Sequence, residues 1–326
     1  MTVIETGQSL LEVEDLSITL STPNGEGHVV EGVSFEIQAG ETFGLVGESG
    51  SGKSMTALSL MRLLPRVARV SAGSIKVREN DLMAMSETQM RRIRGGEIGM
   101  IFQQARSSLS PLMRIGDQVE RVIRTHDSAG GKTPRDMCLE LLDRVGMADT
   151  RRVARSYPHQ LSGGMAQRAL IAIVLAAKPV LLIADEPTTG LDATTEAEIY
   201  DLLRDLREDF GLAILLITHD LALVAENCQR AGVMHAGHLV EQGDVVSIFA
   251  TPLHPYTRGL LASVPRMDGP TSASVSLEGH APALFEWPLT GCRFISRCRH
   301  RMPECTADFP AVEPKPGHRV MCRLYD

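Results

Sequence analysis

Short runs of apolar residues alternate with stretches of helical periodicity along most of the chain. Three continuous apolar runs, at 42–47, 179–185 and 212–218, are typical of strands buried on both faces of a parallel sheet. Between them, apolar residues recur at helical spacing at 115–123 and 137–145. This alternation predicts an α/β fold with a mostly parallel sheet at its core.

Two cysteines fall inside this regular pattern. The helix that contains 137–145 is expected to begin at Thr133, with Asp136 completing a capping box. Cys138 lies on the inward face of this helix, and Cys228 lies in the apolar stretch "LALVAENC". Both are therefore predicted to be buried thiols of the core.

The character of the sequence changes near Pro252, where Pro, Gly, Arg and Cys replace the apolar strands. The chain has 326 residues, which is enough for a large domain and a small one. We predict a first domain at 1–252 and a second at 253–326.

Composition and charge narrow the range of possible partners and locations. The net charge is −7, and Lys and Arg are scattered along the sequence, which argues against nucleic acid as the main partner. The first ten residues lack the basic and apolar segments of a secretion signal. The longest apolar run, 169–177, is far shorter than the ~20 residues of a membrane-spanning helix. We expect a cytoplasmic chain, so any role at a membrane is peripheral.

The first chemical signal is "GESGSGKS" at 47–54, which fits the phosphate-loop pattern between a predicted strand and a predicted helix. Glycines let the backbone N–H groups and a helix N-terminus face the phosphates. Lys53 is expected to reach the β- and γ-phosphates, and the Ser54 hydroxyl to bind Mg²⁺. The predicted nucleotide-binding residues of the loop are Gly47, Glu48, Ser49, Gly50, Ser51, Gly52, Lys53 and Ser54.

The second signal is "LLIADEP", in which an apolar strand ends in two adjacent carboxylates. Ligands of open α/β sheets bind at the carboxyl ends of the strands. Asp185 is therefore expected to hold Mg²⁺, and Glu186 to orient or deprotonate the water that attacks the γ-phosphate.

The third signal is "LSGGMAQR" at 161–168, where Ser162 and two glycines open another helix. This helix start is a second anion-binding N-terminus. Since one site needs one phosphate cradle, the second cradle indicates that the nucleotide is shared between two chains.

Together these motifs resemble those of the ATP-binding cassette (ABC) family. Gln103 in "MIFQQ" is similar to the Q-loop, 190–193 to the D-loop, and His219 in "LITHD" to the switch histidine. The resemblance implies a head-to-tail dimer in which the signature residues of one subunit close on ATP held by the other. It also implies that the helical subdomain, about 104–170, contacts membrane subunits.

The family resemblance assigns the remaining site roles. Glu186, His219 and Gln103 are the implied catalytic residues, and Ser54, Gln103 and Asp185 are the implied Mg²⁺ ligands. The implied ATP contacts outside the phosphate loop are Gln103, Asp185, Ser162, Gly163, Gly164 and Asp192. The aromatic residue that usually stacks on adenine has no counterpart at 11–34, where His28 offers the only ring.

The branch of the family is indicated by "SSLSPLMRIGDQ", "YPHQLSGGMAQR" and "HPYTRGLLASVP". These stretches resemble ATPase subunits of oligopeptide and dipeptide importers, although Gln104 and Ala166 replace the Asp and Arg that are more common there. The implied partners are a sister ATPase or a second copy of this chain, two permease subunits and an extracytoplasmic solute-binding protein. The implied location is the cytoplasmic face of a bacterial inner membrane, and the transported solute stays open.

Two other classes are considered beside the importer. A soluble cassette ATPase that acts on nucleic acid would call for tandem cassettes, coiled-coil insertions or basic arms. A regulatory cassette that binds ATP without turnover would be expected to lack Glu186 or His219.

The C-terminal stretch holds four cysteines in the spacing C-x5-C-x6-C-x16-C: Cys292, Cys298, Cys305 and Cys322. In a reducing cytoplasm, clustered thiols more often hold a metal than form disulfides. We predict a [4Fe–4S] cluster, because the tight C-x2-4-C pairs of zinc ribbons are missing and some importer ATPases hold such a cluster in a similar tail. Zinc and no metal are the alternatives. Four arginines either offset the charge of the cluster or form an exposed basic loop: Arg293, Arg297, Arg299 and Arg301.

Overall fold

The computed structural model describes residues 9–23, 25–263 and 282–326, which form two compact units. The described part of the first unit consists of Gln38–Glu41 and Ala84–Leu215. The second unit consists of Ser9–Ile37, Thr42–Met83 and Leu216–Asp326. The domain boundary near Pro252 and the extent of the helical subdomain stay predictions.

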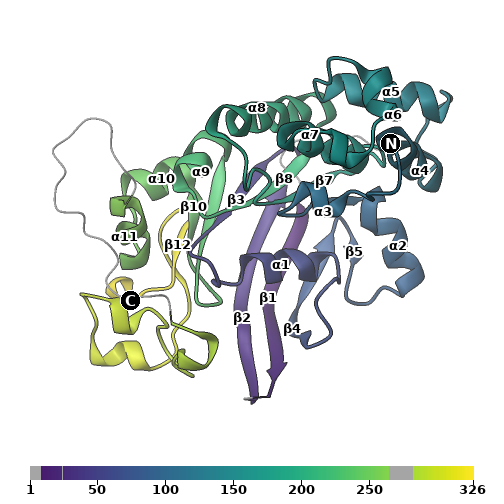
Figure 1. Cartoon of the computed structure of the whole chain (residues 1–326). Helices are drawn as coiled ribbons and strands as arrows, with labels where there is room; N and C mark the ends of the chain where they lie inside the picture. The colour runs from purple at the N-terminus through teal and green to yellow at the C-terminus, as the bar shows by residue number, and fades with distance from the viewer. Residues whose placement is uncertain (1–8, 24, 264–281) are drawn as a thin grey trace. The chain divides into compact units, whose positions relative to one another are not determined.

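An antiparallel sheet of the order β2-β1-β4-β5 lies in the second unit (Figure 1). Its strands are β1 (Ser9–Thr22), β2 (Gly25–Gln38), β4 (Ala68–Val77) and β5 (Asn80–Asp81). Leu11 pairs with Val77 and Val13 with Ile75, and all four side chains are buried. Apolar side chains at alternate positions of paired strands face one side of the sheet, so this face packs into the core.

A second group of strands in this unit supports the phosphate loop. β3 runs parallel to β9, and β9, β10, β12 and β11 follow as antiparallel neighbours. The strands are β3 (Thr42–Val46), β9 (Arg230–His235), β10 (His238–Asp244), β11 (Val312–Lys315) and β12 (His318–Val320). The α-helices of the unit are α1 (Lys53–Leu60), α9 (Leu221–Asn227), α10 (Val245–Ala250) and α11 (Pro255–Ser263).

The first unit combines two parallel strands with a group of helices. The strands are β6 (Ile98–Ile101) and β7 (Leu181–Asp185). The helices are α2 (Glu87–Gly96), α3 (Ala105–Ser108), α4 (Ile115–Thr125), α5 (Pro134–Arg144), α6 (Thr150–Arg155), α7 (Gly163–Leu175) and α8 (Ala193–Phe210). Helices α4, α5, α6 and α7 pack against one another (Figure 1). β8 (Ala213–Thr218) then leads the chain into the second unit.

The strands and helices expected from the apolar pattern are confirmed. The runs at 42–47, 179–185 and 212–218 form β3, β7 and β8, in which every residue is buried. Thr133 is the N-cap of α5, as predicted, because its hydroxyl oxygen accepts a hydrogen bond from the Asp136 N–H at 3.1 Å. The predicted capping box is not formed, since the Asp136 carboxylate accepts from the Thr133 hydroxyl at 2.7 Å and not from the Thr133 backbone N–H.

Both cysteines of the regular pattern are buried, as predicted. Cys138 is fully buried in α5, and Cys228 is 8% exposed just after α9. Burial raises the pKa of the Cys138 thiol to about 11, so this thiol stays protonated at neutral pH.

The C-terminal region at 282–326 is tied into the second unit by contacts between charged and polar side chains. Arg293 pairs with Glu31 of β2, and its guanidinium also donates to the Ala236 carbonyl at 2.7 Å. Glu241 in β10 lies 2.7 Å from the Nε2 of His318 in β12, and both side chains are almost fully buried. Buried carboxylates need such partners, so these contacts hold the region in place.

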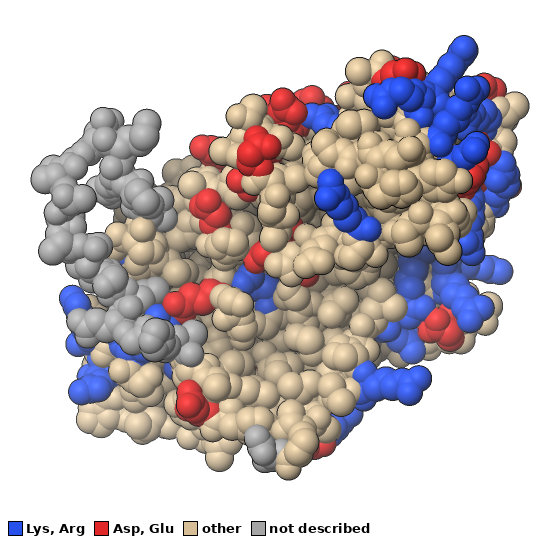
Figure 2. All heavy atoms as spheres, viewed as in Figure 1, with Lys and Arg blue, Asp and Glu red and all other residues tan. Residues whose placement is uncertain are grey.

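Exposed basic side chains gather over α4, α5 and α6 (Figure 2). They are Arg121, Arg124, Lys132, Arg144, Arg151, Arg152 and Arg155. This surface differs from the scatter expected along the sequence, because all seven residues lie within 121–155 and the packing of three short helices brings them together. Four of the seven pair with neighbouring carboxylates, as in Arg144 with Asp209 at 3.0 Å, so much of the charge is compensated locally. None of the helices in the described ranges combines the length and the apolar character needed to cross a membrane.

Candidate functional site

The phosphate-loop motif joins β3 to the start of α1, as the sequence predicted. Lys53, the first residue of α1, is 6% exposed and turns back over the loop. Its Nζ donates hydrogen bonds to the carbonyl oxygens of Gly47 at 2.7 Å and Glu48 at 3.0 Å, and lies 3.4 Å from the Ser51 hydroxyl. The loop is therefore wrapped round the lysine, and the hydroxyl-bearing Ser54 is exposed beside it.

Two glycines fit the loop to its surroundings. Gly52 adopts φ 106°, a conformation that side chains rarely adopt, and a Cβ there would lie 2.9 Å from the Val29 carbonyl oxygen. A Cβ at Gly47 would collide with the carbonyl oxygen of Met234 in β9. A backbone this closely packed, leading into a helix N-terminus, suits the binding of phosphate groups.

The acidic pair follows β7 in the first unit. Asp185 is the last residue of the strand and is 8% exposed, whereas Glu186 begins the turn with φ 46°. Such a positive φ in a residue other than glycine is uncommon and is often found at functional sites.

Parallel pairing of β6 with β7 explains how Gln103 reaches Glu186. Ile101 is paired with Ala184, so the residues that follow the two strands emerge side by side. The Gln103 Nε2 donates to Glu186 Oε2 at 2.8 Å, and the Thr189 hydroxyl donates to the same oxygen at 3.1 Å. Sequence analysis missed Thr189, although a hydroxyl three residues after the glutamate in "EPTT" was a signal for it. Two donors thus fix the carboxylate expected to act on water.

The signature residues lie where α7 meets the start of α8. Ser162 caps α7 by accepting a hydrogen bond from the Met165 N–H at 3.2 Å. A Cβ on Gly164 would lie 2.5 Å from the Thr195 side chain, so only glycine allows this approach. Asp192 caps α8, because its Oδ1 accepts a hydrogen bond from the Thr195 N–H at 3.0 Å. The hydrogen bonds from Thr195 lower the pKa of the Asp192 carboxyl. Gly163 similarly lies beside Leu191, so the signature and D-loop motifs adjoin.

The predicted site residues are divided between the two units. Gln103, Asp185, Glu186, the signature residues and Asp192 belong to the first, and the phosphate loop belongs to the second. His219 also belongs to the second unit, where it is exposed between β8 and α9. His28 is exposed on β2, with its Nδ1 3.3 Å from the Thr19 hydroxyl.

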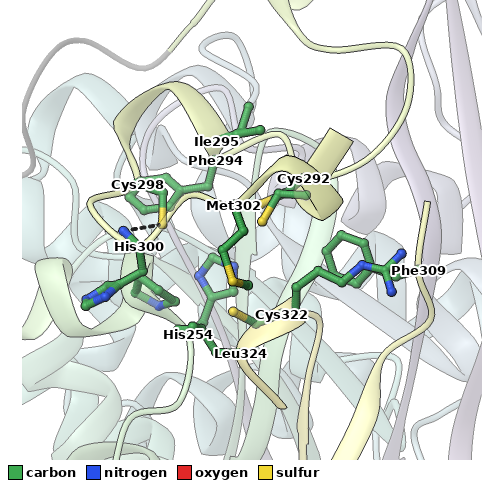
Figure 3. Close-up of a pocket in the computed structure, with 13 residues that line it drawn as sticks. His254, Cys292, Phe294, Ile295, Cys298, His300, Met302, Phe309, Cys322 and Leu324 are labelled. Carbon is green, nitrogen blue, oxygen red and sulfur yellow. Dashed lines mark hydrogen bonds between the residues drawn. The ribbon is translucent and has the colours of Figure 1, made fainter. Parts of the chain in front are cut away.

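The prediction of an iron–sulfur cluster at the four C-terminal cysteines is wrong. Within the described ranges, no group of three or more His, Cys, Asp or Glu side chains is arranged to hold a metal ion. The same finding gives no support to the zinc alternative within the described residues. Cys292, Cys298, Cys305 and Cys322 do line one pocket (Figure 3). The lining also includes His254, His300 and Arg323, and apolar side chains among which are Phe294, Ile295, Met302, Phe309 and Leu324.

The physical reason lies in the size of this pocket and in the state of its thiols. The side chains leave about 10 Å³ of open space in this arrangement, close to the lower limit for a single water. Burial raises the pKa of the Cys292 thiol to about 12 and also raises those of Cys298 and Cys322. These three thiols are therefore protonated at neutral pH.

Two of the arginines expected to offset the charge of the cluster have other partners. Arg293 pairs with Glu31, and Arg297 forms two hydrogen bonds with Glu48 of the phosphate loop, at 2.7 and 2.9 Å. Both arginine side chains are 5% exposed, so neither lies in an exposed basic loop.

Comparison with known proteins agrees with the motifs. The ABC transporter family matches residues 30–189, and the family described as the oligopeptide/dipeptide transporter C-terminal region matches residues 240–305. The chain is 45% identical to the probable peptide ABC transporter ATP-binding protein y4tR of Sinorhizobium fredii, over 96% of this chain and 94% of that one. It is 43% identical to the oligopeptide transport ATP-binding protein AppD of Bacillus subtilis, over 98% and 97% of the two chains. It is 41% identical to OppD of Escherichia coli, an oligopeptide transport ATP-binding protein, over 99% and 98%.

A solved structure supports the same fold. The dimeric structure of MJ0796, described as a bacterial ABC transporter cassette, superposes with a TM-score of 0.64 at 28% identity. The superposition covers 72% of this chain and 98% of the MJ0796 chain. By its fold and its motifs, the protein is an ATP hydrolase of the P-loop type, for which ATP and Mg²⁺ are the expected ligands. More narrowly, the chain belongs to the ABC transporter family, in the branch of the peptide-transport ATPases.

Proposed function

We propose that this chain is the ATP-hydrolysing subunit of an importer for oligopeptides, dipeptides or a related small solute. The observation that carries the proposal is the oligopeptide/dipeptide-type region at 240–305, joined to an ABC cassette as in relatives of nearly the same length. The particular solute depends on other subunits of the importer.

In this proposal, the phosphate loop binds and orients ATP. The backbone N–H groups of 47–54 and the Lys53 ammonium hold the phosphates, which suits the tight packing of Gly47 and Gly52. Ser54, Gln103 and Asp185 are the proposed Mg²⁺ ligands, and the ion neutralises negative charge on the phosphates when bound.

Glu186 is the proposed general base. Its carboxylate accepts hydrogen bonds from Gln103 and Thr189, which keep one oxygen fixed and orient the group toward a water molecule. Gln103 would report the presence of the γ-phosphate to the helices that follow it, and His219 would contact that phosphate directly.

We further propose that two ATPase subunits form a head-to-tail dimer, with Ser162, Gly163, Gly164 and Asp192 of one subunit acting on ATP of the other. The solved dimer of a similar cassette supports dimer formation, and the head-to-tail arrangement follows from the family resemblance. The partner is a sister ATPase or a second copy of this chain. ATP favours the closed dimer, and hydrolysis removes the γ-phosphate contacts that favour it.

The dimer would act at the cytoplasmic face of a bacterial inner membrane as a peripheral component. Its proposed partners there are two permease subunits and, through the complex, an extracytoplasmic solute-binding protein. A nucleic-acid role and a purely regulatory role are not favoured, because the full-length relatives are named for peptide transport.

Purification of the native complex tests this function. We expect the full chain, isolated from membranes of its source cells, to bring with it two permease subunits, and Lys53→Ala cells to lose ATP-driven uptake of peptides. Recovery of nucleic-acid-processing proteins in place of permeases, with peptide uptake intact in Lys53→Ala cells, would contradict the proposal.

A further inference from the structure

Glu48, the second residue of the phosphate loop, is held by a side chain from the far end of the sequence. Arg297 donates through Nη1 to Glu48 Oε2 at 2.7 Å and through Nη2 to Glu48 Oε1 at 2.9 Å. The Arg297 side chain is 5% exposed and that of Glu48 is 27% exposed. A bidentate pair with this little exposure is stronger and more directional than a surface salt bridge.

A second contact fixes the backbone of the same residue. The Glu48 N–H donates to the hydroxyl oxygen of Tyr256 at 2.9 Å, and Tyr256 is fully buried in α11. The Glu48 carbonyl oxygen accepts from the Lys53 ammonium at 3.0 Å. All the polar groups of Glu48 therefore have partners, two of which come from the C-terminal part of the chain.

A cluster of rings supports these two partners. His235, at the end of β9, packs on Tyr256 with ring centroids 4.4 Å apart, and Phe294 lies 5.5 Å from Tyr256. The Arg297 guanidinium lies 5.7 Å from the centre of the Phe294 ring. Because these groups are packed against one another, they present a fixed surface to the loop.

Arg297 also acts electrostatically, because its positive charge compensates the negative charge of Glu48. Burial by itself raises the pKa of the Glu48 carboxyl, but the hydrogen bonds and charge of Arg297 outweigh it and hold the pKa below its usual range. The loop therefore contains an ionised carboxylate, which repels a polyphosphate unless its charge is neutralised.

We propose that Arg297 and Tyr256 are positioning residues that hold the phosphate loop in its ATP-binding form, so that the C-terminal region sets the affinity of this ATPase for ATP. The proposal rests on the assignment of the loop to ATP under Proposed function. Arg297 fixes and neutralises the Glu48 side chain, and Tyr256 fixes the Glu48 backbone. A loop prepared in this way loses less freedom when the phosphates bind.

The test measures affinity for Mg-ATP, with kcat, KM and the thermal midpoint, in the purified full chain. For Arg297→Ala we expect affinity to fall at least about tenfold, because an unpaired carboxylate is left in the loop. Glu48→Gln should weaken Mg-ATP binding less than Arg297→Ala does. The double variant should bind Mg-ATP more tightly than Arg297→Ala alone, because it no longer has the unpaired carboxylate. Tyr256→Phe should raise KM about fivefold by removing the oxygen that accepts from the Glu48 N–H.

A matched control comes from the neighbouring ion pair. Glu31→Gln disrupts the pairing of Arg293, which ties the same C-terminal region to β2, but Glu31 lies outside the phosphate loop. We expect Glu31→Gln to lower the thermal midpoint and leave affinity for Mg-ATP unchanged. If Glu31→Gln weakened ATP binding as much as Arg297→Ala, a general loss of stability would explain both results and the proposal would fail.

Arg297→Lys keeps the test decisive if Arg297→Ala does not fold. Lysine retains the charge but not the two parallel donors, so we expect an affinity between those of Arg297→Ala and the unmutated chain. Lys53→Ala separates the assignment of the loop to ATP from the positioning role of Arg297. If it binds ATP normally, the loop assignment fails; if it loses ATP while the Arg297 variants bind normally, only the positioning role fails.

Discussion

Glu186 is the side chain on which the proposed chemistry depends most directly. Glu186→Gln keeps a group that can pair with Gln103 but removes the base, so we expect ATP binding to persist and hydrolysis to fall roughly 10²- to 10⁴-fold. Phosphate release and nucleotide affinity, measured on the same preparation, check this expectation. Hydrolysis at the unmutated rate would remove Glu186 from the role of base.

Lys53→Ala is the contrasting change, because Lys53 is proposed to hold the phosphates themselves. It is expected to weaken ATP binding, whereas Glu186→Gln is expected to spare it. Equal affinities in the two variants would show that binding and catalysis are not divided between these residues in the way proposed.

Local patterns predicted most of these single residues. Phosphate-loop, carboxylate and signature residues each lie within a short segment, so their spacing alone identified them. Arg297 was recognised only as one of four charges near the cysteines. Its partner Glu48 lies 249 positions away, and no local pattern connects the two.

Among the secondary-structure elements, the contact between α7 and α8 depends on one glycine. Gly164→Ala would place a methyl group 2.5 Å from the Thr195 Cγ2, and overpacking of this kind typically costs about 1–3 kcal/mol of stability. We expect chemical denaturation to show this loss. Adding Thr195→Ser should restore much of it, because serine lacks that methyl group and keeps the hydroxyl that bonds to Asp192.

Gly163→Ala provides the control for this helix start. A Cβ at Gly163 would lie 3.2 Å from the end of the flexible Leu191 side chain, which can move away. We therefore expect a smaller loss of stability than for Gly164→Ala. An equal loss in both variants, or no recovery with Thr195→Ser, would contradict the steric explanation.

The strands and helices were largely predictable because their signals are local. The signals for these elements lie within or next to them in the sequence: apolar runs for β3, β7 and β8, and an N-cap residue for α5. The pairing of β6 with β7 was not predictable from local signals, because it joins segments about eighty residues apart. That pairing is what brings Gln103 to Glu186.

For the whole molecule, the importer proposal predicts where membrane subunits bind. A photo-crosslinking residue placed at Ser107, in exposed α3, should link to a permease in the assembled complex. The same group at Val246, which is 79% exposed on α10, serves as the control and should not. Mass spectrometry identifies the linked chains. Links from Ser107 to soluble proteins alone would favour one of the other cassette classes.

The chain's own sequence determined the class of fold, the nucleotide-binding motifs and the transporter branch, because each of these is carried by residues close together along the chain. The tertiary structure decided the partners of residues that are far apart. It pairs Arg293 with Glu31 and Arg297 with Glu48. It also packs apolar side chains around the four cysteines. Cysteine spacing fixes only how far apart the thiols are in sequence, whereas metal binding needs open volume and thiolates converging in space. Packing settles those quantities, so the spacing, together with the resemblance to importer ATPases, led to the wrong ligand.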